Sequence, residues 1–150
     1  MSQSNPKPNL ADMSDMEFRE ALELVGEWIA QYRQRVGNLP VLARVAPGQI
    51  EKALPAAAPA LGEPVGSWLS DLETIILPGV THWNHPGFLA YFGITGSGPG
   101  ILADLISSAL NLNGMLWKTS PALTELEQVV LRWYAQAMGL PSNWFGTISD

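Results

Sequence analysis

A long stretch rich in proline, alanine and glycine, residues 38–66, limits what this chain can fold into. Proline lacks a backbone N–H and fixes its own φ angle, so the stretch cannot form a long helix or an internal sheet strand. Only Gly48–Leu54 is long enough between breaks to make a short helical piece. A connection of this length with so little regular structure is unusual inside a self-sufficient domain. We therefore expect it to pack as an arm across another surface.

A capping-box pattern marks the start of a helix before this arm. Ser14 is a residue type that favours the N-cap, and Glu17 follows it at the spacing that lets the two residues cap each other's backbone N–H groups. Apolar residues then recur at helical spacing as far as Tyr32, and Gly37 is placed to end the helix. We expect a helix over residues 14–36, preceded by a flexible polar segment at residues 1–13.

Three further helices are expected after the arm. They cover residues 67–77, which Pro78–Gly79 end, residues 99–110, which follow the N-cap candidate Ser97, and the segment that opens at the N-cap candidate Ser120. The chain is therefore expected to be mostly α-helical.

The composition argues against several classes of protein. A net charge of −6 with eight dispersed basic residues disfavours nucleic-acid binding, because phosphate contacts need clustered Lys and Arg. The sequence has no apolar run long enough to span a membrane, no apolar signal-peptide core and no cysteine. We expect a cytoplasmic protein with no membrane or nucleic-acid partner. Six tryptophans beside only 15% charged residues indicate that part of the surface meets another chain.

The aromatic stretch at residues 78–92 is the most distinctive segment. It is too irregular for a helix and too interrupted by Pro and Gly for a long strand. Its apolar bulk comes from Trp83, Phe88, Tyr91 and Phe92, and its polar edges come from His82, Asn84 and His85. Such a mixture suits the wall of a small-molecule pocket. On residue types alone, a loop that closes the end of a helical core is the favoured interpretation.

No complete catalytic or metal-binding set can be assembled from these motifs. His82-x-x-His85 supplies only two metal ligands, with no third ligand nearby, so no metal site is expected. The glycine-rich run 93–100 lacks the ordered motifs of phosphate-binding loops. Ser97 and Ser120 look like helix caps and not like nucleophiles, and no Ser–His–Asp arrangement is supported.

Several motifs in fixed order nevertheless resemble one enzyme family. They are Val45-Ala-Pro-Gly, Leu54-Pro-Ala-Ala-Ala-Pro, Gly62-Glu-Pro, Ile76-Leu-Pro-Gly-Val-Thr-His-Trp-Asn-His-Pro, Ala90-Tyr-Phe, Leu102-Ala-Asp, Ser120-Pro-Ala and Thr124-Glu-Leu-Glu. Together they resemble the N-terminal part of the group II pyridoxal-phosphate-dependent amino-acid decarboxylases, with the strongest likeness to those acting on aromatic L-amino acids. The resemblance covers residues 14 onward.

The resemblance implies an architecture. The chain would be the N-terminal portion of an α/β fold of the aspartate-aminotransferase type (fold type I), whose homodimer shares its active sites between subunits. Residues 14–92 would form a helical dimerisation arm that ends in the aromatic stretch, and residues 93–150 would begin the large cofactor-binding domain. The cofactor would be pyridoxal 5′-phosphate, which acts as the electron sink in amino-acid decarboxylation.

The resemblance also assigns site residues. Trp83, Tyr91 and Phe92 match residues that line the substrate pocket, and Asn113 and Met115 match pocket residues contributed by the other subunit. Asn113 and Met115 stand where aromatic decarboxylases have an aliphatic residue and Phe, and Ile94 stands where they have a substrate-contacting Thr. These differences leave the exact amino-acid substrate open.

The catalytic residues of the family lie downstream of this segment. They include the Schiff-base lysine, so no catalytic or cofactor-binding residue is expected in the chain, and the chain alone is expected to be inactive. Two alternatives remain open from the sequence. One is a non-catalytic helical interaction module, and the other is an aldehyde synthase on the same fold.

Overall fold

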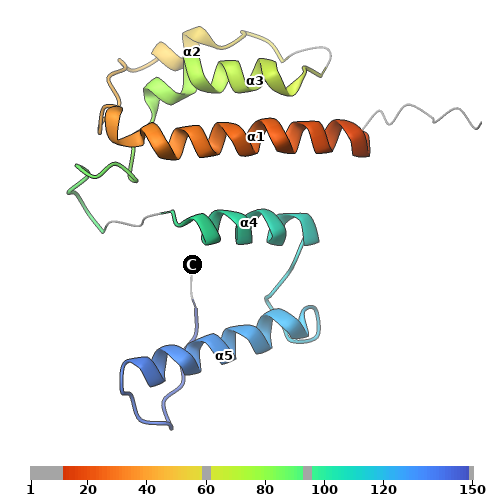
Figure 1. Cartoon of the computed structure of the whole chain (residues 1–150), viewed down its shortest axis with the longest axis vertical. Helices are drawn as coiled ribbons and strands as arrows, with labels where there is room; N and C mark the ends of the chain where they lie inside the picture. The colour runs from red at the N-terminus through yellow and green to blue at the C-terminus, as the bar shows by residue number, and fades with distance from the viewer. Residues whose placement is uncertain (1–11, 59–61, 93–95, 149–150) are drawn as a thin grey trace, which may run out of the picture. The chain divides into compact units, whose positions relative to one another are not determined.

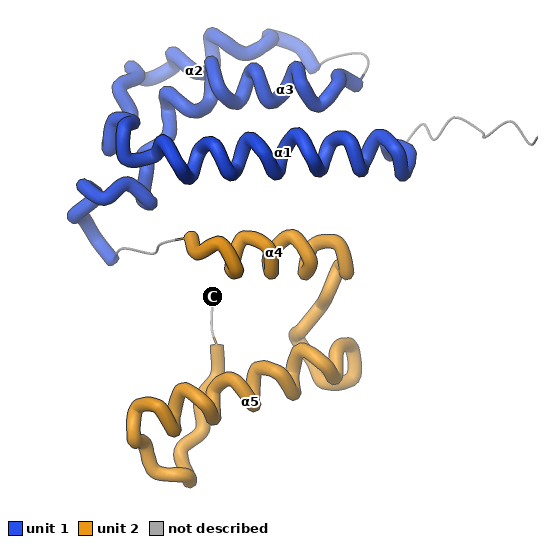
Figure 2. The backbone as a smooth tube through the Cα atoms, viewed as in Figure 1, with its two compact units in different colours: residues 1–95 blue, residues 96–150 orange. Residues whose placement is uncertain are grey.

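The computed structural model describes residues 12–58, 62–92 and 96–148, and the expected flexible segment 1–13 lies mostly outside them. The chain divides into two compact units, residues 1–95 and 96–150 (Figures 1 and 2). Every regular element in the described ranges is helical, as the sequence predicts for the isolated segment. The assignment of residues 14–92 to an arm and 93–150 to a second domain stays a prediction.

Helix α1, Asp15–Arg35, begins as the sequence predicts. Ser14 Oγ accepts a hydrogen bond from the Glu17 N–H at 3.3 Å, and a Glu17 carboxylate oxygen accepts from the Ser14 N–H at 2.7 Å. This reciprocal pairing satisfies two of the N–H groups that a helix start leaves without a partner. A short 3₁₀ helix, η1 (Val36–Asn38), follows α1 before the arm.

The arm carries one short helix, α2 (Gln49–Ala53), where the sequence predicts it. The helix α3 (Val65–Asp71) then continues into a π-helix, η2 (Leu72–Ile76), and a 3₁₀ turn, η3 (Leu77–Gly79). The sequence predicts one regular helix over 67–77 here, so the π-helical part is a correction. Within it, the Thr74 hydroxyl donates to the Ser70 carbonyl at 2.8 Å, the acceptor that the residue 74 N–H would use in an α-helix.

The second unit consists of α4 (Gly98–Leu110) and α5 (Pro121–Ala137). Ser97 caps α4 as predicted, because its hydroxyl accepts from the Gly100 N–H at 3.1 Å. The prediction that Ser120 caps α5 is wrong for its side chain, which makes no capping hydrogen bond. The backbone of Ser120 (φ −153°, ψ 81°) departs from the extended geometry of a capping residue, and Ser120 is buried.

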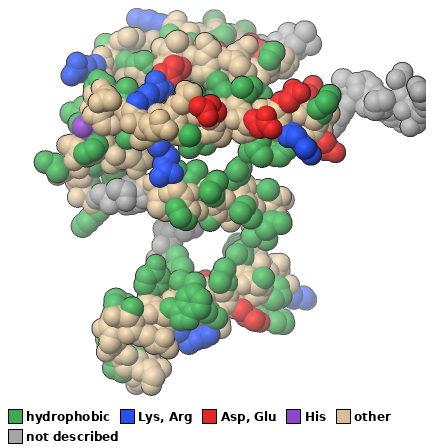
Figure 3. Space-filling model, in the orientation of Figure 1, with side chains coloured by type: hydrophobic (Ala, Val, Ile, Leu, Met, Phe, Trp, Pro, Cys, Tyr) green, Lys and Arg blue, Asp and Glu red, His purple; other side chains and the backbone are tan. Residues whose placement is uncertain are grey.

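Few apolar side chains are buried among the described residues. Ala21, Val36 and Leu77 are buried in the first unit. In the second unit, apolar side chains of α4, of α5 and of the residue that caps the end of α5 are more than half exposed: Leu102, Ile106, Leu110, Trp133, Tyr134 and Met138. Hydrophobic side chains accordingly stand on the visible surface of each unit (Figure 3). None of the described helices combines the length and apolar character needed to cross a bilayer.

Candidate functional site

After η3, the aromatic stretch (residues 78–92) continues as a series of tight turns. Within it, the backbone N–H groups of Trp83, His85 and Phe88 donate to carbonyls two or three residues earlier at 2.9–3.1 Å. The stretch is joined to the start of the arm by one further backbone bond, from the His82 N–H to the Val41 carbonyl at 2.9 Å. This irregular but hydrogen-bonded path agrees with the expectation from the Pro and Gly positions.

Two aromatic rings of this stretch, those of Phe88 and Tyr91, stack against Trp83. Trp83 lies 4.7 Å from Phe88 and 5.9 Å from Tyr91 between ring centroids, with interplanar angles of 30° and 14°. Tyr91 has a φ of 54°, in the left-handed region that a bulky residue adopts at a cost of about 1 kcal/mol or more. Such strain is typical of residues held in place for a function, and here it places the Tyr91 ring on Trp83.

The structure brings together some of the predicted pocket residues within each unit. Trp83 and Tyr91 are in contact, while Phe92 follows Tyr91 with 89% of its surface exposed. In the second unit, the Asn113 side-chain oxygen accepts from the Met115 N–H at 3.1 Å, so Asn113 shapes the turn that presents the exposed Met115. Both residues border an open hollow of about 750 Å³ that Glu127 and Thr147 also line.

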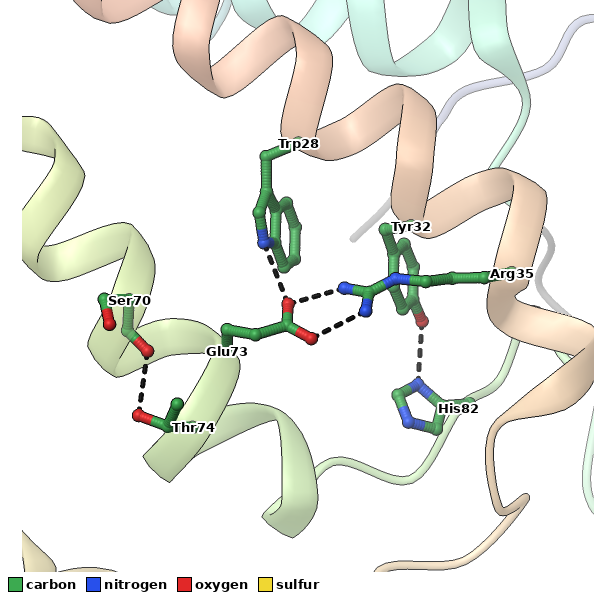
Figure 4. A network of polar contacts seen from close by, with 7 residues as sticks. All are labelled: Trp28, Tyr32, Arg35, Ser70, Glu73, Thr74 and His82. Atoms are coloured by element: carbon green, nitrogen blue, oxygen red, sulfur yellow. Dashed lines mark hydrogen bonds and ion pairs between the residues drawn. The ribbon is translucent and has the colours of Figure 1, made fainter.

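His82 is a buried polar residue directly before Trp83. Only 3% of its surface is exposed, and its Nδ1 is hydrogen-bonded to the Tyr32 hydroxyl at 2.8 Å (Figure 4). Burial lowers the pKa of His82 below its ordinary value, and the neighbouring His85 lowers it further. His82 is therefore kept neutral, with a ring nitrogen committed to a tyrosine of α1.

His85 is held from both of its ring nitrogens. Nδ1 accepts from the Gly87 N–H at 2.8 Å, so the proton lies on Nε2, which donates to the Gly37 carbonyl at 3.1 Å. Both ring nitrogens of His85 are therefore occupied, and neither has a free lone pair to bind a metal ion. Within the described ranges no group of three or more potential ligands is assembled to hold a metal ion.

A carboxylate from the π-helix connects α1 to the second half of the first unit. Glu73 accepts from Trp28 Nε1 at 3.1 Å and from both terminal nitrogens of Arg35, and Trp28 stacks on Tyr32 at 5.6 Å (Figure 4). The Arg35 guanidinium holds the pKa of Glu73 below its ordinary value. Sequence reasoning missed this network, since helical spacing assigns Trp28 and Tyr32 to an apolar stripe. The available signal was that Trp N–H and Tyr O–H groups need partners when packed.

A pocket of about 350 Å³ adjoins this network. Most of its lining is apolar, and its polar members are Arg44, Gln49, Glu73 and His82. Trp83 and Tyr91 do not line it. The aromatic stack of Trp83 and Tyr91 is therefore separate from this pocket.

The described residues do not fit a pyridoxal-phosphate site. A Schiff-base lysine needs a desolvated setting, whereas Lys52 and Lys118 are both exposed. The hydroxyl of Ser97, at the start of α4, is already used as a helix cap.

Comparison with known proteins shows which family this sequence matches. The model of the pyridoxal-dependent decarboxylase conserved domain matches residues 47–149. Phenylacetaldehyde synthase from Rosa hybrid cultivar and tyrosine decarboxylase 4 from Petroselinum crispum are each 41% identical over 128 residues, which is 85% of this chain and 25% of each relative.

Solved structures agree with the sequence matches. The crystal structure of Oryza sativa TDC with PLP and tryptamine has a TM-score of 0.83 to this chain at 34% identity, covering 97% of this chain and 30% of that one. The chain thus spans about a quarter of the length of the relatives that it matches. It is as similar to an aldehyde synthase as to a decarboxylase.

Proposed function

Because the chain belongs to the pyridoxal-dependent decarboxylase family, we propose that it is the N-terminal segment of a pyridoxal-phosphate-dependent L-amino-acid decarboxylase. Aromatic L-amino acids are the proposed substrates, since tyrosine decarboxylase 4 is 41% identical to this chain. The observation that carries the proposal is the family match over residues 47–149, which includes the whole aromatic stretch.

In this proposal, the aromatic stretch forms one wall of the substrate pocket. Trp83 and Tyr91 present stacked rings, and Phe92 is exposed beside them, so an aromatic side chain of a substrate has ring faces to pack against. Asn113 and Met115 are proposed to contribute to the pocket of the other subunit. The chain's task is to bind and orient the substrate side chain, while the cofactor and its lysine are assigned to the part of the enzyme outside this segment.

The exposed apolar side chains support a homodimer. Leu102, Ile106, Trp133 and Met138 each expose more than half of their surface, and an isolated soluble domain rarely leaves so much apolar surface uncovered. We assign this surface to contact with the remainder of the enzyme and with a second subunit. The cytoplasmic location expected from the sequence stays a prediction.

The proposal is tested by measuring products with and without the rest of the enzyme. The complete enzyme, supplied with pyridoxal 5′-phosphate, should release CO₂ from L-tyrosine, L-tryptophan or L-phenylalanine, and the 150-residue chain alone should release none. Turnover by the purified 150-residue chain would contradict the proposal, as would a complete enzyme without activity on amino acids.

An aldehyde synthase is the second candidate, and the 41% identity to phenylacetaldehyde synthase favours it specifically. Quantifying the organic product separates the two activities, because a decarboxylase yields the amine and a synthase yields the aldehyde. A third possibility is a non-catalytic interaction module. It predicts that the chain purifies without a lysine-bearing partner chain and without the absorbance of a bound cofactor aldimine.

A further inference from the structure

Trp83 lies between two histidines that are both tied to the C-terminal end of α1 or to the chain that follows it. On one side, His82 is bonded through Nδ1 to the Tyr32 hydroxyl at 2.8 Å and through its backbone N–H to Val41 at 2.9 Å. On the other side, His85 Nε2 donates to the Gly37 carbonyl at 3.1 Å. The backbone of Trp83 is therefore held on both sides within three residues.

The anchor at Tyr32 is itself fixed. Its ring stacks on Trp28 with an interplanar angle of 0° at 5.6 Å, and Trp28 Nε1 donates to Glu73 at 3.1 Å. Figure 4 shows the Tyr32 hydroxyl pointing at the His82 ring, next to the Arg35–Glu73 pair. A continuous set of packed and hydrogen-bonded side chains thus runs from the π-helix to the residue before Trp83.

The exposure of the residues changes sharply at this point. His82 is 3% exposed, whereas Trp83, the next residue, is 42% exposed and stacks on Phe88 and Tyr91. A buried, hydrogen-bonded base beneath an exposed ring is the arrangement expected when supporting residues lock the geometry of a binding group. A histidine is suited to this role because its ring nitrogen accepts a directional bond that an apolar residue cannot make.

We propose that Tyr32 and His82 are positioning residues for substrate recognition, acting through Trp83. The inference rests on the proposed role of Trp83 as a pocket wall. The Tyr32–His82 hydrogen bond orients the segment that carries Trp83, so that its ring is already in place when the substrate side chain arrives. Neither residue touches the substrate in this arrangement.

The test uses the complete enzyme and the best substrate among L-tyrosine, L-tryptophan and L-phenylalanine. Tyr32→Phe removes only the hydroxyl and should raise KM about 3- to 10-fold, the scale of one hydrogen bond, with kcat within about twofold of wild type. Trp83→Ala is the reference variant and should raise KM about tenfold or more. Tyr134→Phe, which removes the hydroxyl of an exposed tyrosine on α5, should leave both constants unchanged.

A matched pair at His82 tests the geometry of the bond. Asn carries a polar atom near the position of Nδ1, whereas Gln places it near Nε2. His82→Asn should keep KM within about threefold of wild type, and His82→Gln should reproduce the rise in KM seen in Tyr32→Phe. A role in folding alone would lower thermal stability in these variants without separating KM from kcat or Asn from Gln.

The position of the Trp83 ring can be followed directly by ¹⁹F NMR of the enzyme labelled with 5-fluorotryptophan, with the Trp83 resonance assigned by its loss in Trp83→Phe. This resonance should move or broaden in Tyr32→Phe and stay unchanged in Tyr134→Phe. An unchanged resonance and unchanged KM in Tyr32→Phe, with Trp83→Ala impaired, would overturn the positioning role alone. If Trp83→Ala itself has wild-type KM and kcat, the proposed pocket wall fails, and the positioning role in recognition fails with it.

Discussion

Arg35 and Glu73 form a two-pronged ion pair that joins the last turn of α1 to the π-helix η2. The pair is about one-third exposed on each side, and Glu73 accepts a third bond from Trp28. A partly exposed ion pair of this kind is screened by water, so its main effect is on the geometry of two segments that lie far apart in sequence.

Glu73→Gln is expected to lower the stability of the protein by about 1 kcal/mol or less, since Gln keeps an oxygen for Trp28 but loses the charge that pairs with Arg35. Thermal unfolding at low and high salt measures this change, which should shrink as salt screens the wild-type pair. Glu27→Gln is the matched control, because Glu27 is exposed and its carboxylate accepts from Gln31, one turn along the same helix. If Glu73→Gln loses no more stability than Glu27→Gln, the Arg35–Glu73 pair does not contribute to the stability of the first unit.

Acid should destabilise the protein in a window set by His82. Its folded pKa lies below the ordinary value of 6.5, so as pH falls below 6.5 the unfolded chain takes up a proton that the folded chain still excludes. Stability is therefore full above pH 6.5 and is lost as pH falls through the folded pKa. Unfolding free energy measured against pH should show this loss in wild type and not in His82→Asn, which lacks the titrating ring.

A second loss is expected at lower pH from Glu73. The folded pKa of Glu73 lies below the ordinary value of 4.5, so stability present above 4.5 is lost as pH falls through the folded value. Glu73→Gln should remove this second loss and leave the one from His82. If both variants follow the wild-type curve, the assignments of the two groups are wrong.

Ser14→Ala is expected to weaken the first turn of α1 by about 1 kcal/mol, because it removes the hydroxyl that accepts from the Glu17 N–H. Hydrogen exchange of the first-turn amides reports this opening locally. Ser14→Thr keeps the hydroxyl and serves as the control. Equal exchange in wild type and Ser14→Ala would show that the capping box does not hold this end.

Two glycine substitutions should act in opposite directions. A methyl group at Gly87 would meet the His85 ring at 3.1 Å and Val41 at 3.5 Å. Gly87→Ala should therefore displace a ring that is hydrogen-bonded at both nitrogens and lower stability by about 1 kcal/mol.

Gly26 lies within α1 with open space around it, so Gly26→Ala should stabilise the protein by about 0.5–1 kcal/mol. The free energy of unfolding of each variant, measured beside wild type, tests both predictions. Destabilisation by Gly26→Ala would show that the added methyl group is not accommodated in α1.

Local signals predicted much of this fold. The capping box at Ser14 and the hydroxyl cap at Ser97 each join residues that are three apart in the chain, so the residue types alone predict these hydrogen bonds. Ser120 carries the same signal, yet its side chain does not cap, because a cap also needs an extended backbone that the preceding turn does not provide. Residue type alone cannot specify that backbone.

Contacts between distant residues were less accessible to sequence reasoning. Glu73 lies 38 residues from Arg35, and nothing in its own neighbourhood distinguishes it from a solvated glutamate on a helix. The stack of Trp83, Phe88 and Tyr91 was foreseeable as an aromatic cluster, since the three rings lie close in the chain. Its support by Tyr32 was not, because that bond spans 50 residues.

The π-helix η2 has a consequence for the length of this segment. Each residue of a helix turns the chain by about 100°, and a π-helical turn accommodates one residue more than an α-helical turn. Deleting one residue within Leu72–Ile76 would let the segment relax to an α-helix that turns the chain by nearly the same total angle, so the residues on either side would keep their orientation about the helix axis. A deletion that spares Glu73 would therefore keep both the pair with Arg35 and the burial of Leu77, whereas the same deletion within α1 would rotate one end of that helix against the other.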